Sequence, residues 1–123
     1  MTLYAALLYY PPDAERWDKP EECWAEHEQF IGSATEAGVL RGGQALEPDH
    51  TAATVTVDAG AGDQVLVTDG PFAEAKEVLG GFYLIEAADM DEAVRWAARI
   101  PAAWQGKVEV RPVQAPPGST PPA

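Results

Sequence analysis

Two segments of this sequence read as β-strands with apolar side chains on both faces, and few folds accommodate such strands in a short chain. They are residues 3–10 (Leu-Tyr-Ala-Ala-Leu-Leu-Tyr-Tyr) and residues 79–87 (Leu-Gly-Gly-Phe-Tyr-Leu-Ile-Glu-Ala). Continuous apolar runs are typical of strands whose sheet is covered on both sides. A chain of 123 residues has enough helix to cover one face only. We therefore expect a second copy of the chain to cover the other face, which predicts a homodimer.

The patterns on either side of these segments predict two helices and a further strand. We expect a helix over residues 20–37, because Pro20 fits its first turn and Gly38 fits a C-terminal cap. A second helix is expected to begin at Asp89, where Asp-Met-Asp-Glu fits an acidic capping box. A last strand is expected over residues 108–113, so each helix would connect two strands.

The middle of the chain is interpreted as a hairpin entered through a flexible segment. Residues 41–43 (Arg-Gly-Gly) predict a flexible crossing, and residues 51–57 and 64–68 predict two hairpin strands around a glycine-rich loop. The whole order is then strand, helix, two hairpin strands, strand, helix, strand. It predicts an α+β, ferredoxin-like βαββ(β)αβ sandwich with its helices on one face of an antiparallel sheet.

Composition restricts the partners of the chain. The formal net charge is -12, from 20 acidic and 8 basic side chains. Such a charge repels phosphates and anionic headgroups, so we expect no nucleic-acid partner and no membrane partner. The apolar N-terminus has no basic leader and is too short to span a bilayer, and Cys23 is the single cysteine, which together favour a cytoplasmic protein. With two histidines and one cysteine, we expect no metal site and no cofactor.

The chain is expected to form one domain followed by a short tail. We assign residues 1–113 to the domain, since the predicted strands and helices all fall within it. Residues 114–123 are rich in proline and carry no periodic apolar pattern. They predict a frayed C-terminal tail.

One stretch, residues 68–77, combines turn residues with charges just before the second apolar strand. Asp-Gly-Pro is turn chemistry, so Asp69 either bonds the backbone of its own turn or acts on a ligand or a histidine. The charged residues that follow either form a solvated turn, line a pocket mouth or pair across the dimer. The candidate pocket or motif residues of this stretch are Thr68, Gly70, Pro71, Phe72, Glu74, Lys76 and Glu77.

His27 is the best candidate for a general acid or base, because histidine titrates near neutral pH. It lies between Trp24 and Ile31 on the apolar stripe of the first helix, and so it is expected to face the sheet. The alternative is a buried histidine whose ring nitrogens are satisfied by hydrogen bonds. Tyr83, in the second apolar strand, offers a hydroxyl group to a ligand or serves only in packing.

Residues 68–77 resemble the motif of the DGPF-domain branch of the YCII-related proteins. The resemblance covers nearly the whole chain apart from the tail, and it implies a dimeric α/β barrel. Further similar stretches are residues 24–30 (Trp-Ala-Glu-His-Glu-Gln-Phe), residues 37–43, residues 80–85 (Gly-Gly-Phe-Tyr-Leu-Ile), residues 97–101 (Ala-Ala-Arg-Ile-Pro) and residues 108–112 (Val-Glu-Val-Arg-Pro).

The resemblance also implies candidate chemistry. YCII-related proteins have been proposed to be small enzymes with a histidine–aspartate pair in a pocket, and a related branch includes a dehydrochlorinase. The helix-one histidine of the family corresponds to His27, and the motif aspartate corresponds to Asp69. The second-strand aspartate of the YciI-type branch has no counterpart in residues 41–43. Many DGPF proteins are encoded beside extracytoplasmic-function sigma factors, which implies a sigma factor as a partner.

Our first functional hypothesis is a small cofactor-independent enzyme acting on an unknown organic molecule in a pocket of the dimer. His27 would be the general acid or base, Asp69 its partner, and the turn with Glu74, Lys76 and Glu77 part of the pocket wall. The expected reaction class is proton transfer with elimination or isomerisation. The alternative is a non-catalytic module that binds a ligand or a protein such as a sigma factor. A cofactorless monooxygenase of similar fold is a third and more distant hypothesis.

Overall fold

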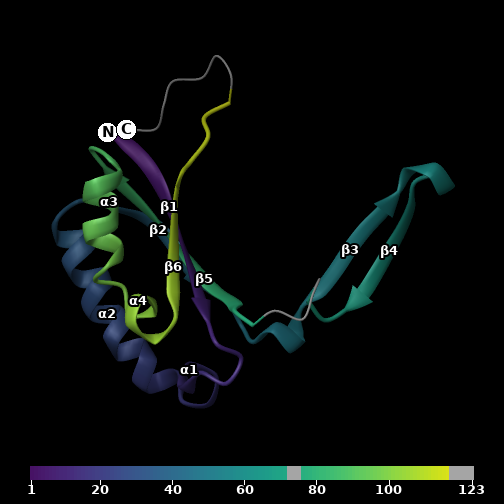
Figure 1. The fold of residues 1–123 in the computed structure, drawn as a ribbon, viewed down its shortest axis with the longest axis horizontal. Helices are drawn as coiled ribbons and strands as arrows, with labels where there is room; N and C mark the ends of the chain where they lie inside the picture. Colours follow the sequence, from purple (N-terminus) through teal and green to yellow (C-terminus); the bar gives the residue numbers. More distant parts are fainter. Residues whose placement is uncertain (72–75, 117–123) are drawn as a thin grey trace.

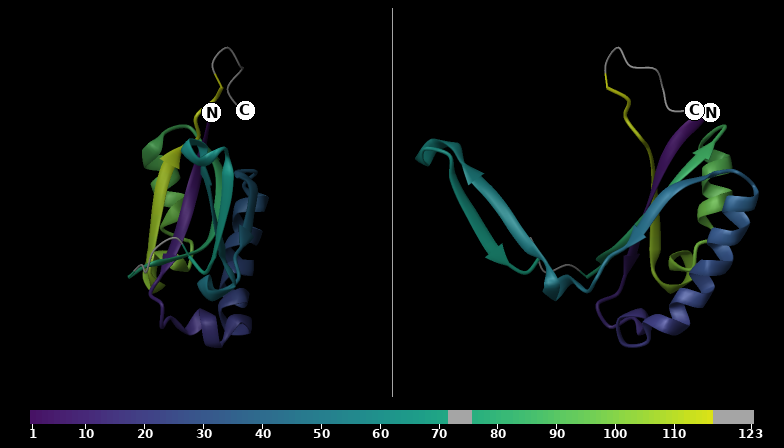
Figure 2. Two further views of the ribbon diagram at one scale, coloured as in Figure 1. Left: turned by 90° about the vertical axis from the view of Figure 1, so that its right-hand side faces the viewer. Right: turned by 180° about the vertical axis from the view of Figure 1, so that it is seen from behind.

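The computed structural model describes residues 1–71 and 76–116, which form a four-stranded antiparallel sheet with helices on one face and a two-stranded arm (Figures 1 and 2). The elements are, in chain order, β1 (Thr2–Tyr10), α1 (Glu15–Asp18), α2 (Pro20–Glu36), β2 (Leu40–Ala45), η1 (Asp49–Thr51), β3 (Ala53–Asp58), η2 (Ala59–Ala61), β4 (Gln64–Asp69), β5 (Val78–Ala87), α3 (Met90–Ala97), α4 (Ala102–Gln105) and β6 (Lys107–Pro112).

The four strands of the main sheet lie in the order β2-β5-β1-β6, and all neighbours are antiparallel. Strand β1 is central, with Leu7 opposite Phe82 of β5 on one side and opposite Glu109 of β6 on the other. Each helical connection therefore crosses over one intervening strand, which is the ferredoxin-like arrangement. The predicted α+β class, with an antiparallel sheet and helices, is confirmed.

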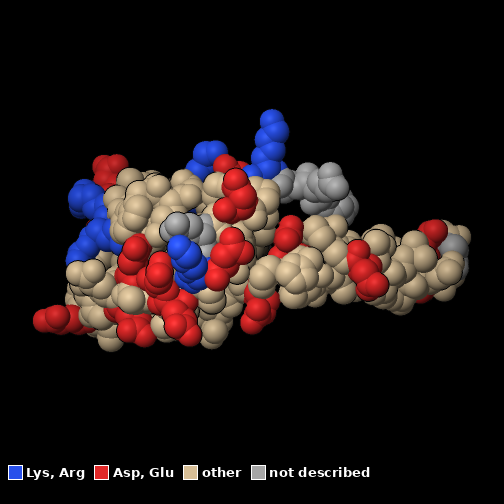
Figure 3. Space-filling model, turned by 90° about the horizontal axis from the view of Figure 1, so that it is seen from below, with Lys and Arg blue, Asp and Glu red and all other residues tan. Residues whose placement is uncertain are grey.

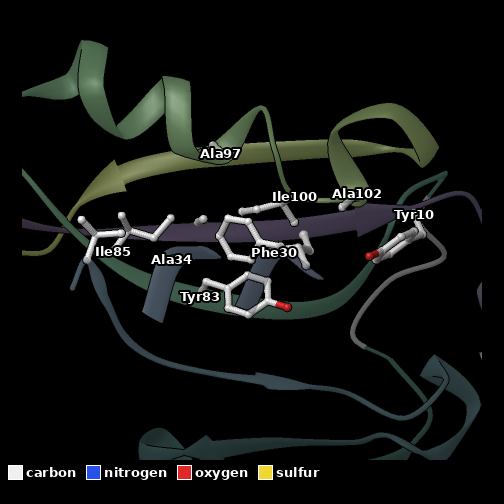
Figure 4. Packing of buried hydrophobic residues seen from close by; sticks show 11 residues of the cluster. Tyr10, Phe30, Ala34, Tyr83, Ile85, Ala97, Ile100 and Ala102 are labelled. Carbon is white, nitrogen blue, oxygen red and sulfur yellow. The ribbon is translucent and has the colours of Figure 1, made fainter. Parts of the chain in front are cut away.

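The core lies between this sheet and the helices. Alternate residues of β1 point to opposite faces of the sheet, so one set of its side chains faces the helices. Tyr4, Ala6, Leu8 and Tyr10 are all buried on the helix side. The remaining core side chains come from β5, the helices and the segments that connect them, and Figure 4 shows them packed against the sheet. They include Phe30, Ala34, Tyr83, Ile85, Ala97 and Ile100.

The opposite face of the sheet carries the other apolar set of β1 and β5. Leu7 of β1 and its neighbours Phe82 and Leu84 of β5 are only half-buried there. No helix of the described residues lies on this face (Figure 2). The prediction that both strands are apolar on two faces is thus confirmed, and one of those faces is open in the single chain.

The predicted hairpin forms, but its predicted place in the sheet is wrong. Strands β3 and β4 pair only with each other and project from the body as an arm (Figures 1 and 2). The arm carries few charges along its length (Figure 3). It is inserted between β2 and β5, whose adjacent ends are joined by a hydrogen bond from the Leu46 amide to the Gly80 carbonyl, 2.9 Å long.

The edge position of the sheet belongs to residues 41–43, which were expected to be a flexible crossing and instead lie in β2. Their glycines have a steric role. A side chain at Gly43 would place its Cβ 2.6 Å from the Phe82 carbonyl oxygen, closer than real contacts allow. Glycine therefore permits the close approach of β2 to β5.

Two further points concern the start of helix α3 and the length of the helices. Asp89 caps α3 by accepting a hydrogen bond from the Glu92 amide, 2.9 Å, while the Glu92 carboxylate accepts one from the Ala88 amide, 3.1 Å. The acidic capping motif is thus confirmed. Within the part of the chain that the structure describes, no helix is long and apolar enough to cross a membrane.

Candidate functional site

Helix α2 places His27 against the sheet. The helix begins at Pro20 and ends before Gly38, whose φ of 76° is the left-handed conformation that glycine adopts readily. The Gly38 amide donates to the Thr35 carbonyl and the Val39 amide to the Ala34 carbonyl, which closes the last turn. Between these ends the inward stripe carries His27, which is 9% exposed.

Both ring nitrogens of His27 are hydrogen-bonded to tyrosine hydroxyl groups. Nε2 lies 3.1 Å from the Tyr10 hydroxyl, and Nδ1 lies 2.7 Å from the Tyr83 hydroxyl. Figure 4 shows the two hydroxyl groups directed toward the space between the rings. A neutral imidazole has one donor and one acceptor nitrogen, so one tyrosine donates to the ring and the other accepts from it. The accepting tyrosine keeps its own proton for another acceptor.

Burial sets the protonation states of this Tyr10–His27–Tyr83 cluster. Desolvation, with a further contribution from the Arg16 charge, lowers the pKa of His27 to about 4. Burial likewise raises the pKa of Tyr83 to about 12 and raises the pKa of Tyr10 above its ordinary value. At neutral pH the cluster is therefore an uncharged imidazole between two protonated phenols.

Arg16 of α1 is the cation beside this cluster. Its Nη1 donates to the Gly80 carbonyl at 2.7 Å, and its Nη2 donates to the Leu46 carbonyl at 3.4 Å. The guanidinium carbon lies 4.6 Å from the Tyr10 ring centroid and 4.5 Å from that of Trp17. A Cβ on Gly80 would collide with Arg16 and would lie 2.7 Å from the Tyr10 ring, so the arginine requires glycine at this position.

A pocket of about 310 Å³ opens between helices α1 and α2 and strands β2 and β5. His27, Tyr83 and Arg16 all line it. Aromatic walls are supplied by Trp17 and Trp24, and the exposed Glu47 is a further charged residue of the lining. This volume and mixture of apolar walls with a few polar groups are typical of sites for small organic molecules.

The structure places the predicted pair, His27 and Asp69, apart. Both nitrogens of His27 are bonded to tyrosines, while Asp69 is exposed at the end of β4, opposite Ala53. Thr68 is also exposed on the arm, and Gly70, with a φ of 97°, donates its amide to the Ala52 carbonyl at 2.7 Å. These motif residues close the base of the arm rather than line the pocket.

The remaining motif residues lie on the surface or outside the described part of the chain. Phe72 and Glu74 lie outside the described residues. Pro71 and Lys76 are exposed. Glu77 pairs with Lys107 of β6, at 2.7 Å, and does not line the pocket. Within the described residues no group of three histidine, cysteine or acidic side chains is placed to hold a metal ion.

Sequence reasoning identified His27 and Tyr83 but missed Tyr10 and Arg16. Tyr10 belongs to the same strand face as Tyr4, Ala6 and Leu8, so the alternation of β1 indicates that it faces the helices. Its contact with His27 depends on how α2 packs over β1. No local pattern marks Arg16, because its role comes from contacts with residues 30 and 64 positions away.

The chain belongs to the YCII-related domain family, whose sequence profile matches residues 2–115. A relative, the uncharacterized protein R00369 of Rhizobium meliloti (strain 1021), is 39% identical over 116 residues, covering 90% of this chain and 91% of the relative. Among solved structures, the chain is similar to the 5-chloro-2-hydroxyhydroquinone dehydrochlorinase TftG of Burkholderia phenoliruptrix AC1100, in complex with 2,5-dihydroxybenzoquinone. The TM-score is 0.52 at 15% identity, covering 91% of this chain and 93% of that chain, which supports the α+β fold.

Proposed function

We propose that this chain is a small-molecule enzyme that transfers protons at His27, without a cofactor, in an elimination or isomerisation reaction. The observation that carries the proposal is the Tyr10–His27–Tyr83 cluster in the wall of the pocket. A purely structural histidine needs only hydrogen-bond partners for its two ring nitrogens and no contact with a cavity. His27 and its partner Tyr83, however, also line a cavity large enough for a ring compound, which favours a functional role.

The protonation states divide the chemical roles. An imidazole that is neutral at pH 7 accepts a proton from a substrate carbon or oxygen, and the burial that lowers its pKa keeps it unprotonated until then. Tyr83, whose pKa is raised to about 12, stays protonated in the pocket wall, so its hydroxyl passes its proton to Nδ1 of His27 as its oxygen takes the proton of the substrate. The Tyr10 hydroxyl is hydrogen-bonded to Nε2, on the other side of the His27 ring, and so keeps the imidazole in place.

The structural similarity to TftG supports a ring compound as the substrate. TftG is a dehydrochlorinase of a chlorinated hydroxyhydroquinone, and its structure holds a dihydroxybenzoquinone. At 15% identity the similarity concerns the fold, so the substrate of this chain is inferred from its own pocket walls. Besides Tyr83, those walls contain the aromatic side chains of Trp17 and Trp24.

The test is a substrate screen with a matched pair of histidine variants. Chlorinated hydroquinones, hydroxyquinones and enolisable ketones are incubated with the protein, and products and chloride release are measured. We expect His27→Gln to lower kcat by about a hundredfold or more. His50→Gln, which changes the exposed second histidine in η1, should leave turnover unchanged. Unchanged turnover in His27→Gln contradicts the proposal, and retention of a sigma factor without any turnover favours the binding-module alternative.

We also propose that the chain is a cytoplasmic protein of the DGPF branch and a homodimer of the dimeric α/β barrel type. The Asp-Gly-Pro-Phe motif at residues 69–72 supports the branch. The half-buried apolar face of β1 and β5 supports the dimer, since a second copy is a cover of the same size and chemistry. The arm supports it further, as its valines lack any cover within the described part of the chain.

A further inference from the structure

We propose that Arg16 binds an ionised oxygen of the substrate, so that the pocket selects planar ring compounds carrying a phenolate, enolate or carboxylate group. This inference rests on the small-molecule function proposed for the same pocket. It adds the charge and the shape of the molecule that the pocket accepts.

The first step is the charge of Arg16, which no described carboxylate balances. The three ion pairs among the described residues belong to Arg41, Lys107 and Arg111. Arg16 instead donates to two neutral carbonyl oxygens, those of Gly80 and Leu46. In a chain with 20 acidic and 8 basic side chains, a partly buried arginine without an acidic partner is poorly explained by packing alone.

The second step is the geometry of its donors. A guanidinium group has five N–H donors in a planar fork, and the two carbonyl oxygens use two of them. The rings of Tyr10 and Trp17 pack against the group and fix its plane. An arginine held in this way in a pocket wall presents preorganised donors to an anionic oxygen.

The third step is the shape of the pocket. Trp17 and Trp24 provide flat apolar walls, and the volume of about 310 Å³ suits a single substituted ring. Glu47 is the one acidic side chain among the described lining residues, and it is exposed. A planar anion would therefore place its ring between aromatic side chains and its charged oxygen at Arg16.

The fourth step links the bound anion to His27. The Arg16 charge contributes to the low pKa of His27, after burial. An anion that neutralises this charge removes that contribution, so the pKa of His27 rises when the anion binds. The substrate would then strengthen the base that acts on it.

The experiment compares anions with neutral molecules of the same shape in the full-length protein. The pairs are benzoate with benzamide, and 2,5-dihydroxybenzoquinone with its dimethyl ether, measured by titration calorimetry at pH 7. We expect each anion to bind about tenfold or more tightly than its neutral partner. Preference for the anion in only one pair identifies the carboxylate or the ring oxygen as the group that Arg16 binds. Equal affinity within both pairs overturns the proposal.

The matched variants are Arg16→Gln and Arg99→Gln, since Arg99 also packs on a tryptophan, Trp96, but does not line the pocket. Arg16→Gln should reduce anion affinity about tenfold to a hundredfold and spare the neutral compounds, and Arg99→Gln should change neither. In the wild-type protein, an NMR titration of His27 should show its pKa rising with the anion and not with the neutral partner. Anion preference retained in Arg16→Gln, or a His27 pKa that does not respond, overturns the proposal.

The outcomes separate this inference from the proposed enzyme function. Anion preference without turnover of any compound contradicts the enzyme and supports the role of Arg16. Turnover of neutral substrates that is unaffected by Arg16→Gln supports the enzyme and contradicts the role of Arg16.

Discussion

A histidine held between two tyrosine hydroxyl groups is uncharged over most of the pH range in which proteins are stable. For His27 the cause is burial first and the nearby Arg16 second, and both disfavour the imidazolium form. The tyrosines satisfy both ring nitrogens in the uncharged state. The residue is therefore ready to accept a proton only when the pocket contents stabilise the resulting charge.

This environment predicts a pH-dependent term in stability. The folded pKa of about 4 lies below the ordinary value of 6.5, so the unfolded chain binds more protons between these values. The unfolding free energy therefore falls as the pH decreases from 6.5 toward 4, and His27 accounts for a loss of about 2 kcal/mol by pH 5. Urea unfolding followed by tryptophan fluorescence at pH 7, 6 and 5 measures it.

The control for this prediction is His27→Gln, which removes the titrating group. The other acidic and basic groups titrate in both proteins, so the difference between the two stability curves isolates His27. Curves that run parallel from pH 7 to pH 5 would show that the histidine is not held in its uncharged form.

At the residue scale the sequence predicted part of the candidate site. The position of His27 follows from helical periodicity, because a residue three after Trp24 and four before Ile31 faces the sheet. Its partners could not be derived in the same way, since Tyr10 and Tyr83 come from different strands. Asp69 shows the limit most clearly, because its turn chemistry was visible whereas the direction taken by the arm was not.

At the scale of the elements, glycines decide how closely strands and side chains approach. Gly80 is the clearest case, since its missing side chain makes room for Arg16 and Tyr10. Gly43 does the same for the pairing of β2 with β5. Sequence reasoning nevertheless predicts a flexible crossing for the Arg-Gly-Gly sequence at residues 41–43, because glycine also permits bending. A glycine that allows close packing and a glycine that allows bending look identical in one sequence.

A pair of glycine substitutions tests this distinction. Gly80→Ala would place Cβ 2.7 Å from the Tyr10 ring and displace Arg16 from its carbonyl, so we expect a destabilisation of about 1–3 kcal/mol. Gly32→Ala lies in α2 with no atom within 4 Å of the new Cβ, and should stabilise by up to about 1 kcal/mol. Urea unfolding gives both values, and a Gly80→Ala protein as stable as the wild type would contradict the contact with Arg16.

On the scale of the whole molecule, two apolar surfaces of the described residues are exposed to solvent. One is the open face of the main sheet, around Leu7, Phe82 and Leu84. The other is the valine face of the arm, where the cross-strand pairs Val55–Val67 and Val57–Val65 are between 55% and 62% exposed. An isolated two-stranded hairpin is only marginally stable, and exposed apolar surfaces of this kind are typical of interfaces.

The predicted homodimer can be tested on the valine face. Replacing Val55 and Val67 by threonine keeps the β-branched shape that favours strands but adds a polar hydroxyl group to each side chain. We expect the double variant to raise the Kd of the dimer about tenfold or more, because apolar contact is lost in both copies. Analytical ultracentrifugation over a range of micromolar concentrations measures the change.

The control is Thr56→Ser on the opposite face of the same hairpin, which should leave the Kd unchanged. A wild-type protein that sediments as a monomer at micromolar concentration would show that the open faces are not a dimer interface. A double variant with the wild-type Kd would confine the interface to the main sheet.

The way in which the arm is attached has a consequence for the evolution of such chains. Ala45 lies opposite Gly81 and the Leu46 amide bonds the Gly80 carbonyl, so β2 and β5 already meet as the two legs of a hairpin. Everything between them is an expansion of that hairpin's loop. Its first residues, Leu46 to Pro48, line the pocket, but the strands and helices around the pocket come from outside the loop. A change in the length of the arm beyond Pro48 would therefore leave the pairing of β2 with β5 intact. We expect length differences among homologues to concentrate there, with assembly diverging faster than the chemistry of the pocket.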